Sequence, residues 1–300
     1  MATTINGVDC AIELKGTGLP ACVQELGNPV GFFKTSINWS FDSETETFDL
    51  SYIQTQIQNG NFVPFLESFN FTDNSEETVF QTSQSGNESK VRSGKAKVQF
   101  DFQKGLCWHT SAYTHNKSQL SIIYIWSNGV FGVNYNETTG LVKGQRANYL
   151  DVGTFTNNDG TNQFTTPIMI QFRNTDEYNA NMATIKATDF TLDDIKGAID
   201  VTIKVPTPPV DTENTIQFTA FAGCNSTYSI GVLASDDIAI TGKTVNTLVF
   251  DPQTELYTAT IAETFDSGDT YTVSINDGTY DSAIVENQIY KGKSASLTVA

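Results

Sequence analysis

Short runs in which apolar and polar residues alternate recur along almost the whole chain. Successive side chains of a β-strand point to opposite faces, so a period of two indicates a strand that is buried on one side. Residues 95–102 give the clearest example, with four apolar side chains on one face: Ala96, Val98, Phe100 and Phe102. Residues 120–126 are almost continuously apolar, as in a strand covered on both faces. The pattern predicts an all-β fold.

Composition supports the same fold class. Aromatic residues make up 11% of the chain and charged residues only 17%, and 22 glycines are available for turns. Threonine and aromatic side chains fit pleated surfaces, whereas Asn, Ser and Gly fit the turns between strands. Four further strands are expected in the first two thirds of the chain: residues 36–41, 130–133, 149–152 and 167–172.

Helix is expected to be scarce. Thr175 precedes two acidic residues, which suits the start of a short helix over residues 175–182. Residues 192–199 are expected to add another turn or two. Two long polar segments, residues 42–60 and 73–94, are interpreted as loops, and loops of this length in a compact domain are usually functional or ordered by a neighbour.

A proline-rich segment predicts the domain boundary. Three prolines lie within residues 206–209, and they favour an extended spacer that lacks backbone donors. We therefore expect a first β domain over residues 1–205, a linker over 206–212 and a second β domain over 213–300. Turn residues separate the strands expected in this second domain, which are 215–221, 227–233, 246–250, 256–261, 270–275 and 294–299.

The second domain resembles the immunoglobulin-like β-sandwich modules that are appended to bacterial surface proteins and phage structural proteins. The resemblance is one of strand pattern and length, and the Cys…Trp…Cys signature of true immunoglobulin domains is missing.

The chain is strongly acidic, with a formal net charge of −17. After Val205 there are 12 acidic and 3 basic residues. Such a charge disfavours binding to nucleic acid or to an anionic membrane. No apolar run reaches the ~18 residues that a membrane-spanning helix requires. The beginning of the sequence lacks the basic and apolar regions of a secretion signal, so we expect a protein made in the host cytoplasm.

The four cysteines, Cys10, Cys22, Cys107 and Cys224, show no CxxC spacing. Free thiols are the expectation, and a Cys10–Cys22 bridge is the alternative. The two histidines, His109 and His115, would face the same side as Cys107 if residues 107–115 formed one strand. At ~3.3 Å per residue, however, His115 would lie ~12 Å or more from the other two, too far to share one metal ion.

Other potential chemistry is interpreted as turn structure. Acidic pairs occur at Glu76–Glu77, Asp193–Asp194 and Asp236–Asp237, and neighbouring residues of a strand point to opposite faces. Two Asn-Asp-Gly sequences, residues 158–160 and 276–278, lack the ligand series of a calcium loop and indicate hairpin turns. No GxSxG or phosphate-binding motif occurs. We therefore expect a non-enzymatic protein with no catalytic, cofactor-binding or metal-binding residues.

One segment resembles a known family. Residues 77–86, Glu-Thr-Val-Phe-Gln-Thr-Ser-Gln-Ser-Gly, followed by Val91-Arg-Ser-Gly94 and Val98-Gln-Phe-Asp-Phe-Gln-Lys-Gly105, are similar to the core of phage tail tube proteins. The opening Thr4-Ile-Asn-Gly-Val-Asp9 is also similar to the start of those proteins. The resemblance covers residues 1–185, and the first 65 residues are longer than is usual in the family.

The resemblance implies a structural subunit of a phage-like particle, most directly a tail tube or a tail or neck ring component in the virion. Its partners would be copies of itself in rings or tubes, together with other virion structural proteins. Two alternatives remain: a capsid decoration protein, and an adhesin that binds glycans through exposed tryptophans such as Trp39, Trp108 and Trp126.

Overall fold

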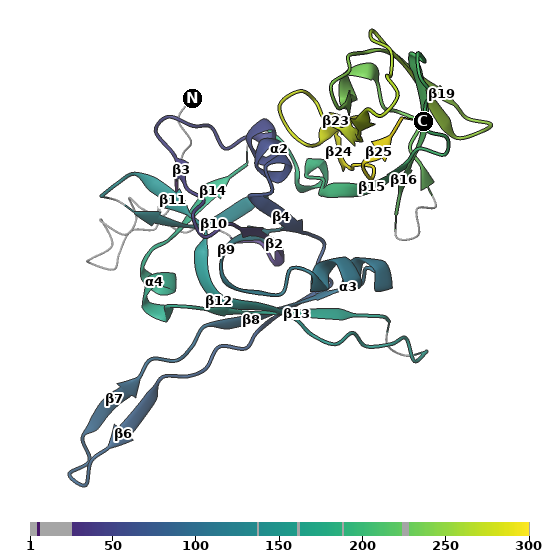
Figure 1. Cartoon of the computed structure of the whole chain (residues 1–300). Coiled ribbons are helices and arrows are strands. Elements are labelled where there is room, and N and C mark those ends of the chain that lie inside the picture. The colour runs from purple at the N-terminus through teal and green to yellow at the C-terminus, as the bar shows by residue number, and fades with distance from the viewer. Residues whose placement is uncertain are drawn as a thin grey trace. The chain divides into compact units, whose positions relative to one another are not determined.

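The structure, a computed structural model, describes residues 5–6, 26–136, 138–160, 163–187, 189–223 and 228–299. The prediction of an all-β fold is confirmed: most elements are strands, with short helices between them (Figure 1). The chain divides into two compact units, one made of Met1–Ile53 and Asn61–Ile195 and the other of Gln54–Gly60 and Lys196–Ala300.

The first unit is built on a 12-stranded sheet that curves into a half-barrel. Its main path runs β1-β14-β10-β9-β12-β13-β8-β5, while β2 joins β9 to β4, and β11 joins β10 to β3. The strands are β1 (Ile5–Asn6), β2 (Pro29–Thr35), β3 (Phe41–Asp42), β4 (Phe62–Phe65), β5 (Asn70–Asp73), β8 (Lys97–Phe102), β9 (Lys117–Trp126), β10 (Val130–Asn136), β11 (Leu141–Lys143), β12 (Gln145–Val152), β13 (Thr166–Phe172) and β14 (Met182–Lys186).

A separate two-stranded sheet, β6 (Val79–Thr82) with β7 (Glu88–Arg92), interrupts the chain between β5 and β8. The helices of the first unit and the segments around it are α2 (Leu50–Gln58), α3 (Leu106–Tyr113), α4 (Thr175–Ala180) and the 3₁₀ turn η3 (Leu192–Asp194).

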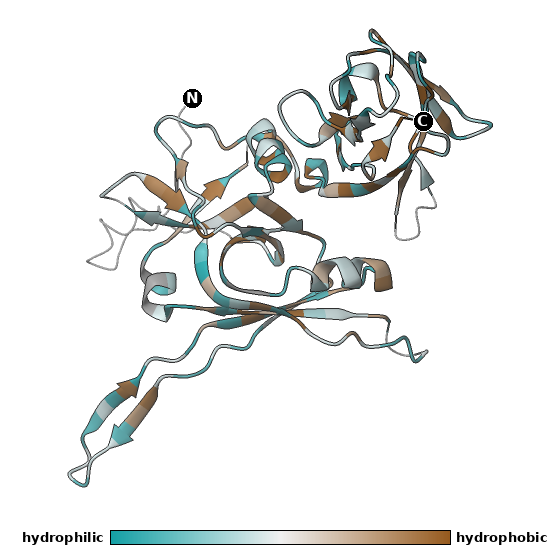
Figure 2. Cartoon of the chain, viewed as in Figure 1, coloured by the Kyte–Doolittle hydropathy of each residue, from teal (hydrophilic) through white to brown (hydrophobic). Residues whose placement is uncertain are grey.

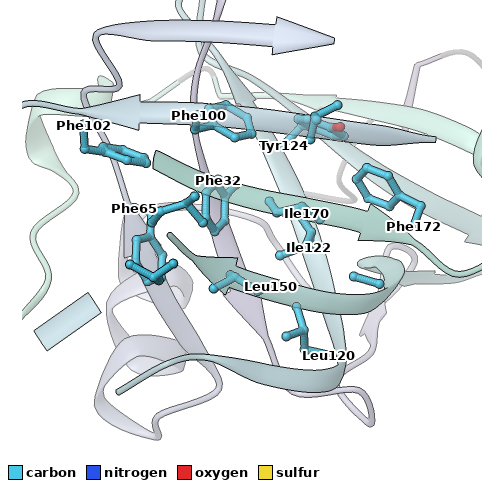
Figure 3. Close-up of a cluster of buried hydrophobic side chains, with 14 of the residues drawn as sticks. Phe32, Phe65, Phe100, Phe102, Leu120, Ile122, Tyr124, Leu150, Ile170 and Phe172 are labelled. Atoms are coloured by element: carbon cyan, nitrogen blue, oxygen red, sulfur yellow. The ribbon is translucent and has the colours of Figure 1, made fainter. Parts of the chain in front are cut away.

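Aromatic side chains fill the core of the first unit (Figure 3). Phe32 of β2 stacks on Phe65 of β4, with ring centroids 4.8 Å apart, and meets Phe100 of β8 at 5.1 Å. Offset and tilted contacts of this kind stabilise a core beyond the area that the rings bury. The next residue of β2, Phe33, points to the opposite face and stacks on Phe62 at 4.9 Å. Both faces of β2 are therefore covered, and the same holds for β9, as its apolar sequence predicts.

Several strand predictions in the first unit are confirmed and one is wrong. Strands occur where residues 95–102, 120–126, 130–133, 149–152 and 167–172 predict them. Residues 36–40 do not form a strand but the turn after β2, and only Phe41 belongs to a strand, the short β3. The alternation there arises because Trp39 and Phe41 are buried while their neighbours are not. The strand lies immediately before, in β2, where the run Pro-Val-Gly-Phe-Phe-Lys-Thr carries no alternation.

The two segments interpreted as long loops both contain regular structure. Helix α2 occupies much of residues 42–60, and the β6–β7 hairpin occupies most of residues 73–94. The predicted helix at residues 175–182 is confirmed in α4, whereas residues 192–199 form only the single turn η3 before a strand begins at Ala198.

The second unit is a sandwich-like arrangement of short strands. Its largest sheet runs β19-β20-β16-β15-β24-β23, with β17 beside β16, and two small sheets pair β18 with β22 and β21 with β25. The elements are β15 (Ala198–Lys204), β16 (Thr215–Ala222), β17 (Tyr228–Ser229), η4 (Ser235–Asp237), β18 (Ile238–Ile240), β19 (Val245–Asp251), β20 (Leu256–Ile261), β21 (Thr270–Tyr271), β22 (Val273–Ile275), β23 (Ala283–Val285), β24 (Gln288–Lys291) and β25 (Leu297–Thr298).

The boundary between the units differs from the predicted one at residue 205. Strand β15 pairs with β16 and, in parallel, with β24, so residues 198–204 belong to the second unit. The proline-rich segment 206–212 therefore connects two paired strands of one sandwich and is not a linker between domains. It is held there by backbone hydrogen bonds such as Thr212 N–H to the Phe265 carbonyl, at 2.8 Å. Proline marks a loop without regular hydrogen bonds, and such a loop occurs within domains as well as between them.

Candidate assembly surface

A β-hairpin arm, residues 74–96, projects from the first unit (Figure 1). The chain leaves the sheet after β5, forms β6 and β7, and re-enters the sheet at β8. Within the hairpin, Phe80 pairs with Lys90 and Thr82 with Glu88, and a bulge lies next to the pair of Val79 with Arg92. The polar sequence Ser-Gln-Ser-Gly-Asn supplies the turn at its tip, where Gly86 has a φ of +84°.

The base of the arm is fixed to the sheet. The backbone N–H of Asn74 donates to the Lys97 carbonyl, and that of Glu76 donates to the Lys95 carbonyl, both at 2.9 Å. Thr175, the first residue of α4, donates its hydroxyl to the Gly94 carbonyl at 2.7 Å. These bonds hold the direction in which the arm leaves the sheet.

Beyond its base, the arm exposes apolar side chains to solvent. Every residue of β6 and β7 is exposed, and the exposed fractions are 39% for Val79, 56% for Phe80 and 57% for Val91. Figure 2 shows apolar positions on both strands. An isolated two-stranded hairpin is at best marginally stable in water, and an exposed cluster of large apolar side chains usually marks an interaction site. The arm therefore has the properties of a surface that another molecule covers.

One carboxylate organises the charges at the base. Glu76 accepts hydrogen bonds from Lys97 Nζ at 2.6 Å and from Arg92 Nη1 at 3.2 Å. The hydrogen bond from Lys97, followed by that from Arg92, lowers the pKa of Glu76, and the same contact raises the pKa of Lys97. The two strands of the arm are thus cross-linked by charge where they meet the sheet.

The sheet itself ends in strands with free edges. β5 pairs only with β8, and β4 pairs only with β2, among the strands of the described residues. Phe69, immediately before β5, is 69% exposed. Unpaired backbone groups on an edge strand can pair with a strand of another molecule. β5 continues into the arm, so the edge and the hairpin form one candidate surface.

The histidines and Cys107 do not form a metal site. Residues 106–113 form helix α3 and not the strand on which the same-face argument depended. His109 bonds to the Thr166 hydroxyl through Nδ1 at 3.1 Å, whereas His115 Nδ1 contacts Lys34 Nζ at 3.1 Å. Among the described residues, no group of three His, Cys, Asp or Glu side chains could hold a metal ion.

The expectation of free thiols is wrong for Cys107, which is disulfide-bonded in the structure. The other three cysteines, Cys10, Cys22 and Cys224, lie outside the described residues, as does most of the opening segment 4–9 that resembles tail tube proteins.

Two of the acidic pairs are turn structures. Asp194 accepts a hydrogen bond from the Thr191 N–H at 2.8 Å, and Asp237 accepts one from the Ala234 N–H at 2.8 Å. Each caps a 3₁₀ turn. The Asn-Asp-Gly sequences are also turns: the Asn158 side chain accepts from the Gly160 N–H at 2.9 Å, and Asn276 and Gly278 repeat the contact at 2.7 Å. The third pair, Glu76–Glu77, lies at the base of the arm.

Two of the three tryptophans are core residues. Trp39 and Trp126 are buried, at 6% and 7% exposure, whereas Trp108 is partly buried and packs against the core cluster of the first unit. The burial of Trp39 and Trp126 leaves them unsuited to stacking on a glycan.

The candidate surface that the sequence analysis did not predict contains the exposed side chains of Phe80 and Val91. The sequence does contain a signal for the hairpin that exposes them, because two runs of high β-propensity flank a Ser-Gly-Asn turn.

No family model matches the chain, and no curated protein matches it either. Within the described ranges, no helix is long and apolar enough to cross a membrane.

Proposed function

We propose that this chain is a structural subunit of a bacteriophage-like particle, a tail tube or a tail or neck ring component, which assembles with copies of itself in the virion. The observation that carries the proposal is the arm. A hairpin that is fixed at its base, exposed along both strands and apolar at Phe80 and Val91 is suited to docking on a neighbour.

The free edges of the first unit support the same function. A subunit in which β4 and β5 each have one free edge can extend its sheet into that of an adjacent copy. Few charged side chains lie on β5, where Asp73 is the sole ionisable residue of four. The acidic net charge also suits a tube through which DNA passes, because cationic contacts are what retain DNA.

The strand order of the second unit supports its assignment as an immunoglobulin-like module. Seven strands, β15, β16, β18, β19, β20, β22 and β25, can be lettered A to G in chain order. The large sheet then contains the run D-E-B-A, and the small sheets pair C with F and β21, which precedes F, with G. This run and these pairs resemble the partition of strands in constant-type immunoglobulin domains, to which β17, β23 and β24 are additions in the large sheet. A tube domain followed by such a module is an arrangement of the family that the sequence resembles.

Electron microscopy of the purified full chain tests the proposal. We expect rings or tubes in negative stain, with a fraction that rises with protein concentration. Discrete monomers across the concentration series would contradict it, and monomers that bind a glycan array would support the adhesin alternative instead. Binding to preformed capsids without self-assembly would support a capsid decoration protein.

A further inference from the structure

Two oppositely charged surfaces lie on the first unit. Residues 90–97, which are the end of the arm and its return to β8, contain four bases and no acid, namely Lys90, Arg92, Lys95 and Lys97, whereas the acids of the arm, Glu76, Glu77 and Glu88, precede them in the sequence. Residues 42–49, which we call the acidic turn, contain four acids and no base: Asp42, Glu44, Glu46 and Asp49. The first surface belongs to the arm and its return to β8, and the second connects β3 to α2.

The basic surface has charge available for a partner. Lys90 and Lys95 are exposed and make no ion pair with any described residue. Arg92 remains half exposed, at 53% of its side chain, while it pairs with Glu76. Phe80 lies opposite Lys90 across the hairpin. The stretch from Lys90 to Lys95 thus combines exposed cations with exposed apolar side chains, which is the composition of an interface with a charged rim. The exposed acids Glu77 and Glu88 offset part of this charge on the rest of the arm.

The acidic turn is held in a fixed conformation. Glu46 accepts a hydrogen bond from the Asp42 N–H at 2.8 Å, and Asp49 accepts one from the Tyr52 N–H at 2.7 Å. Phe48 anchors the turn in the core, edge to face with Phe41 at 5.7 Å. Glu44 points into solvent from this frame. A preorganised surface loses little conformational entropy when a partner binds.

The two surfaces cannot meet within one copy. The acidic turn joins the sheet through β3 and β11 to β10, whereas the arm continues from β5 and β8. Strands β9, β12 and β13 separate β10 from β8 in the sheet. Figure 1 shows β3 at the end of the first unit opposite to the hairpin. Complementary surfaces at opposite ends of a subunit generate head-to-tail contacts, which produce open stacks or closed rings.

We propose that the arm of one copy docks on the acidic turn of the next copy, so that successive subunits associate head to tail through Lys90 and Lys95 against Glu44 and its neighbours. This inference rests on the proposed function, since it names the partner surface of the arm. The charges set the register and the rate of encounter, and the apolar side chains of the hairpin supply the buried area.

Charge reversal in the full chain tests the pairing. We expect Lys90→Glu with Lys95→Glu to raise the critical concentration for assembly at least about tenfold, and Glu44→Lys with Glu46→Lys to do the same, because like charges then face each other. Glu44→Lys alone is the second turn variant, since it leaves the Glu46 bond to Asp42 intact. Sedimentation velocity and negative stain provide the readout, and circular dichroism confirms folding.

Mixing the two double variants gives the decisive result. In the mixture, the reversed arm of one variant meets the reversed turn of the other, and the unaltered arm of the second meets the unaltered turn of the first. Opposite charges therefore face each other at every contact, and alternating stacks form at a critical concentration close to that of the wild type. A matched control, Lys186→Glu with Lys204→Glu, makes the same change in net charge at exposed positions outside the arm. It is expected to assemble as the wild type does.

The outcomes separate the two proposals. If the wild type assembles and neither double variant nor their mixture differs from the control, the docking of the arm on the acidic turn is refuted while the proposed function stands. If the wild type itself remains monomeric in every condition, the proposed function fails. Loss of assembly in both variants without rescue on mixing also overturns the pairing, since the two surfaces would then act on different partners.

Discussion

A Cβ atom added to Gly94 would lie 1.8 Å from the carbonyl oxygen of Glu76. The two chain segments that form the base of the arm therefore touch through their backbones, and no residue other than glycine fits at position 94 without a shift of the backbone. The direction of the arm depends on this contact together with the hydrogen bonds beside it.

We expect Gly94→Ala to destabilise the base of the arm by about 1–3 kcal/mol, because overpacking at a rigid site forces the backbone apart. Amide hydrogen exchange at Glu76, whose N–H bonds to the Lys95 carbonyl, measures the effect directly. The control is Gln84→Ala at the exposed tip of the arm, which leaves the base unaltered. Equal exchange at Glu76 in the wild type and in Gly94→Ala would contradict the packing described.

The charge cluster at the arm base predicts a pH dependence. Hydrogen bonds from Lys97 and Arg92 lower the pKa of Glu76 below its ordinary value of 4.5. The stabilisation is therefore fully present above that value and is lost as the pH falls through the lowered pKa of the folded state. An NMR titration of the Glu76 carboxyl carbon should show the lowered pKa, and Lys97→Met should raise it towards 4.5. An unchanged titration in the variant would mean that Lys97 does not hold the carboxylate.

Two buried tyrosines of the second unit provide a matched pair. The Tyr257 hydroxyl oxygen accepts a hydrogen bond from the buried Leu233 N–H at 3.1 Å, whereas the buried Tyr271 hydroxyl has no hydrogen-bond partner within the described part of the chain. We expect Tyr257→Phe to lower the free energy of unfolding by about 1–3 kcal/mol, because it leaves a buried donor unpaired. Tyr271→Phe should be neutral or stabilising. Chemical denaturation compares them, and equal destabilisation would count against the hydrogen bond.

The same tyrosine predicts behaviour at high pH. Burial raises the pKa of Tyr257 to about 12. The neutral phenol is favoured in the folded state, so its contribution to stability is complete below pH 10 and is lost as the pH rises through about 12. The ultraviolet difference spectra of the wild type and of Tyr257→Phe should differ by the ionisation of one phenol in that upper pH range. A phenol that ionises near 10 would show that Tyr257 is solvated.

Strands with a clear period of two could be predicted from the sequence, and those covered on both faces could be predicted only in part. β8 alternates strictly because one of its faces is buried. β2 was missed because Phe32 and Phe33 are both fully buried, on opposite faces, and such a run has no period. Residues 36–41 resembled one longer strand because the turn between β2 and β3 buries Trp39, two residues before the buried Phe41 of β3.

The candidate surface was harder to predict than the fold, since it depends on which residues are left uncovered. Phe80 and Val91 resemble the core residues of any strand in the sequence, and only their place on a hairpin outside the sheet exposes them. The proline-rich segment shows the same limit for domain boundaries. Its composition indicates a loop, but the loop is internal to the unit because β15 pairs with β24, and that pairing joins residues 91 positions apart, such as Ala198 and Ile289.

Sedimentation velocity on the full chain with the exposed Phe80 and Val91 of the arm replaced tests the central claim most directly. We expect the wild type to assemble with increasing concentration and Phe80→Ser with Val91→Ser to remain monomeric, because the exposed side chains that drive docking are gone while the core is untouched. Val249→Ser, at a position that is 63% exposed in the second unit, is the matched control and should assemble normally. Assembly of the Phe80→Ser and Val91→Ser variant at the wild-type concentration would contradict the account.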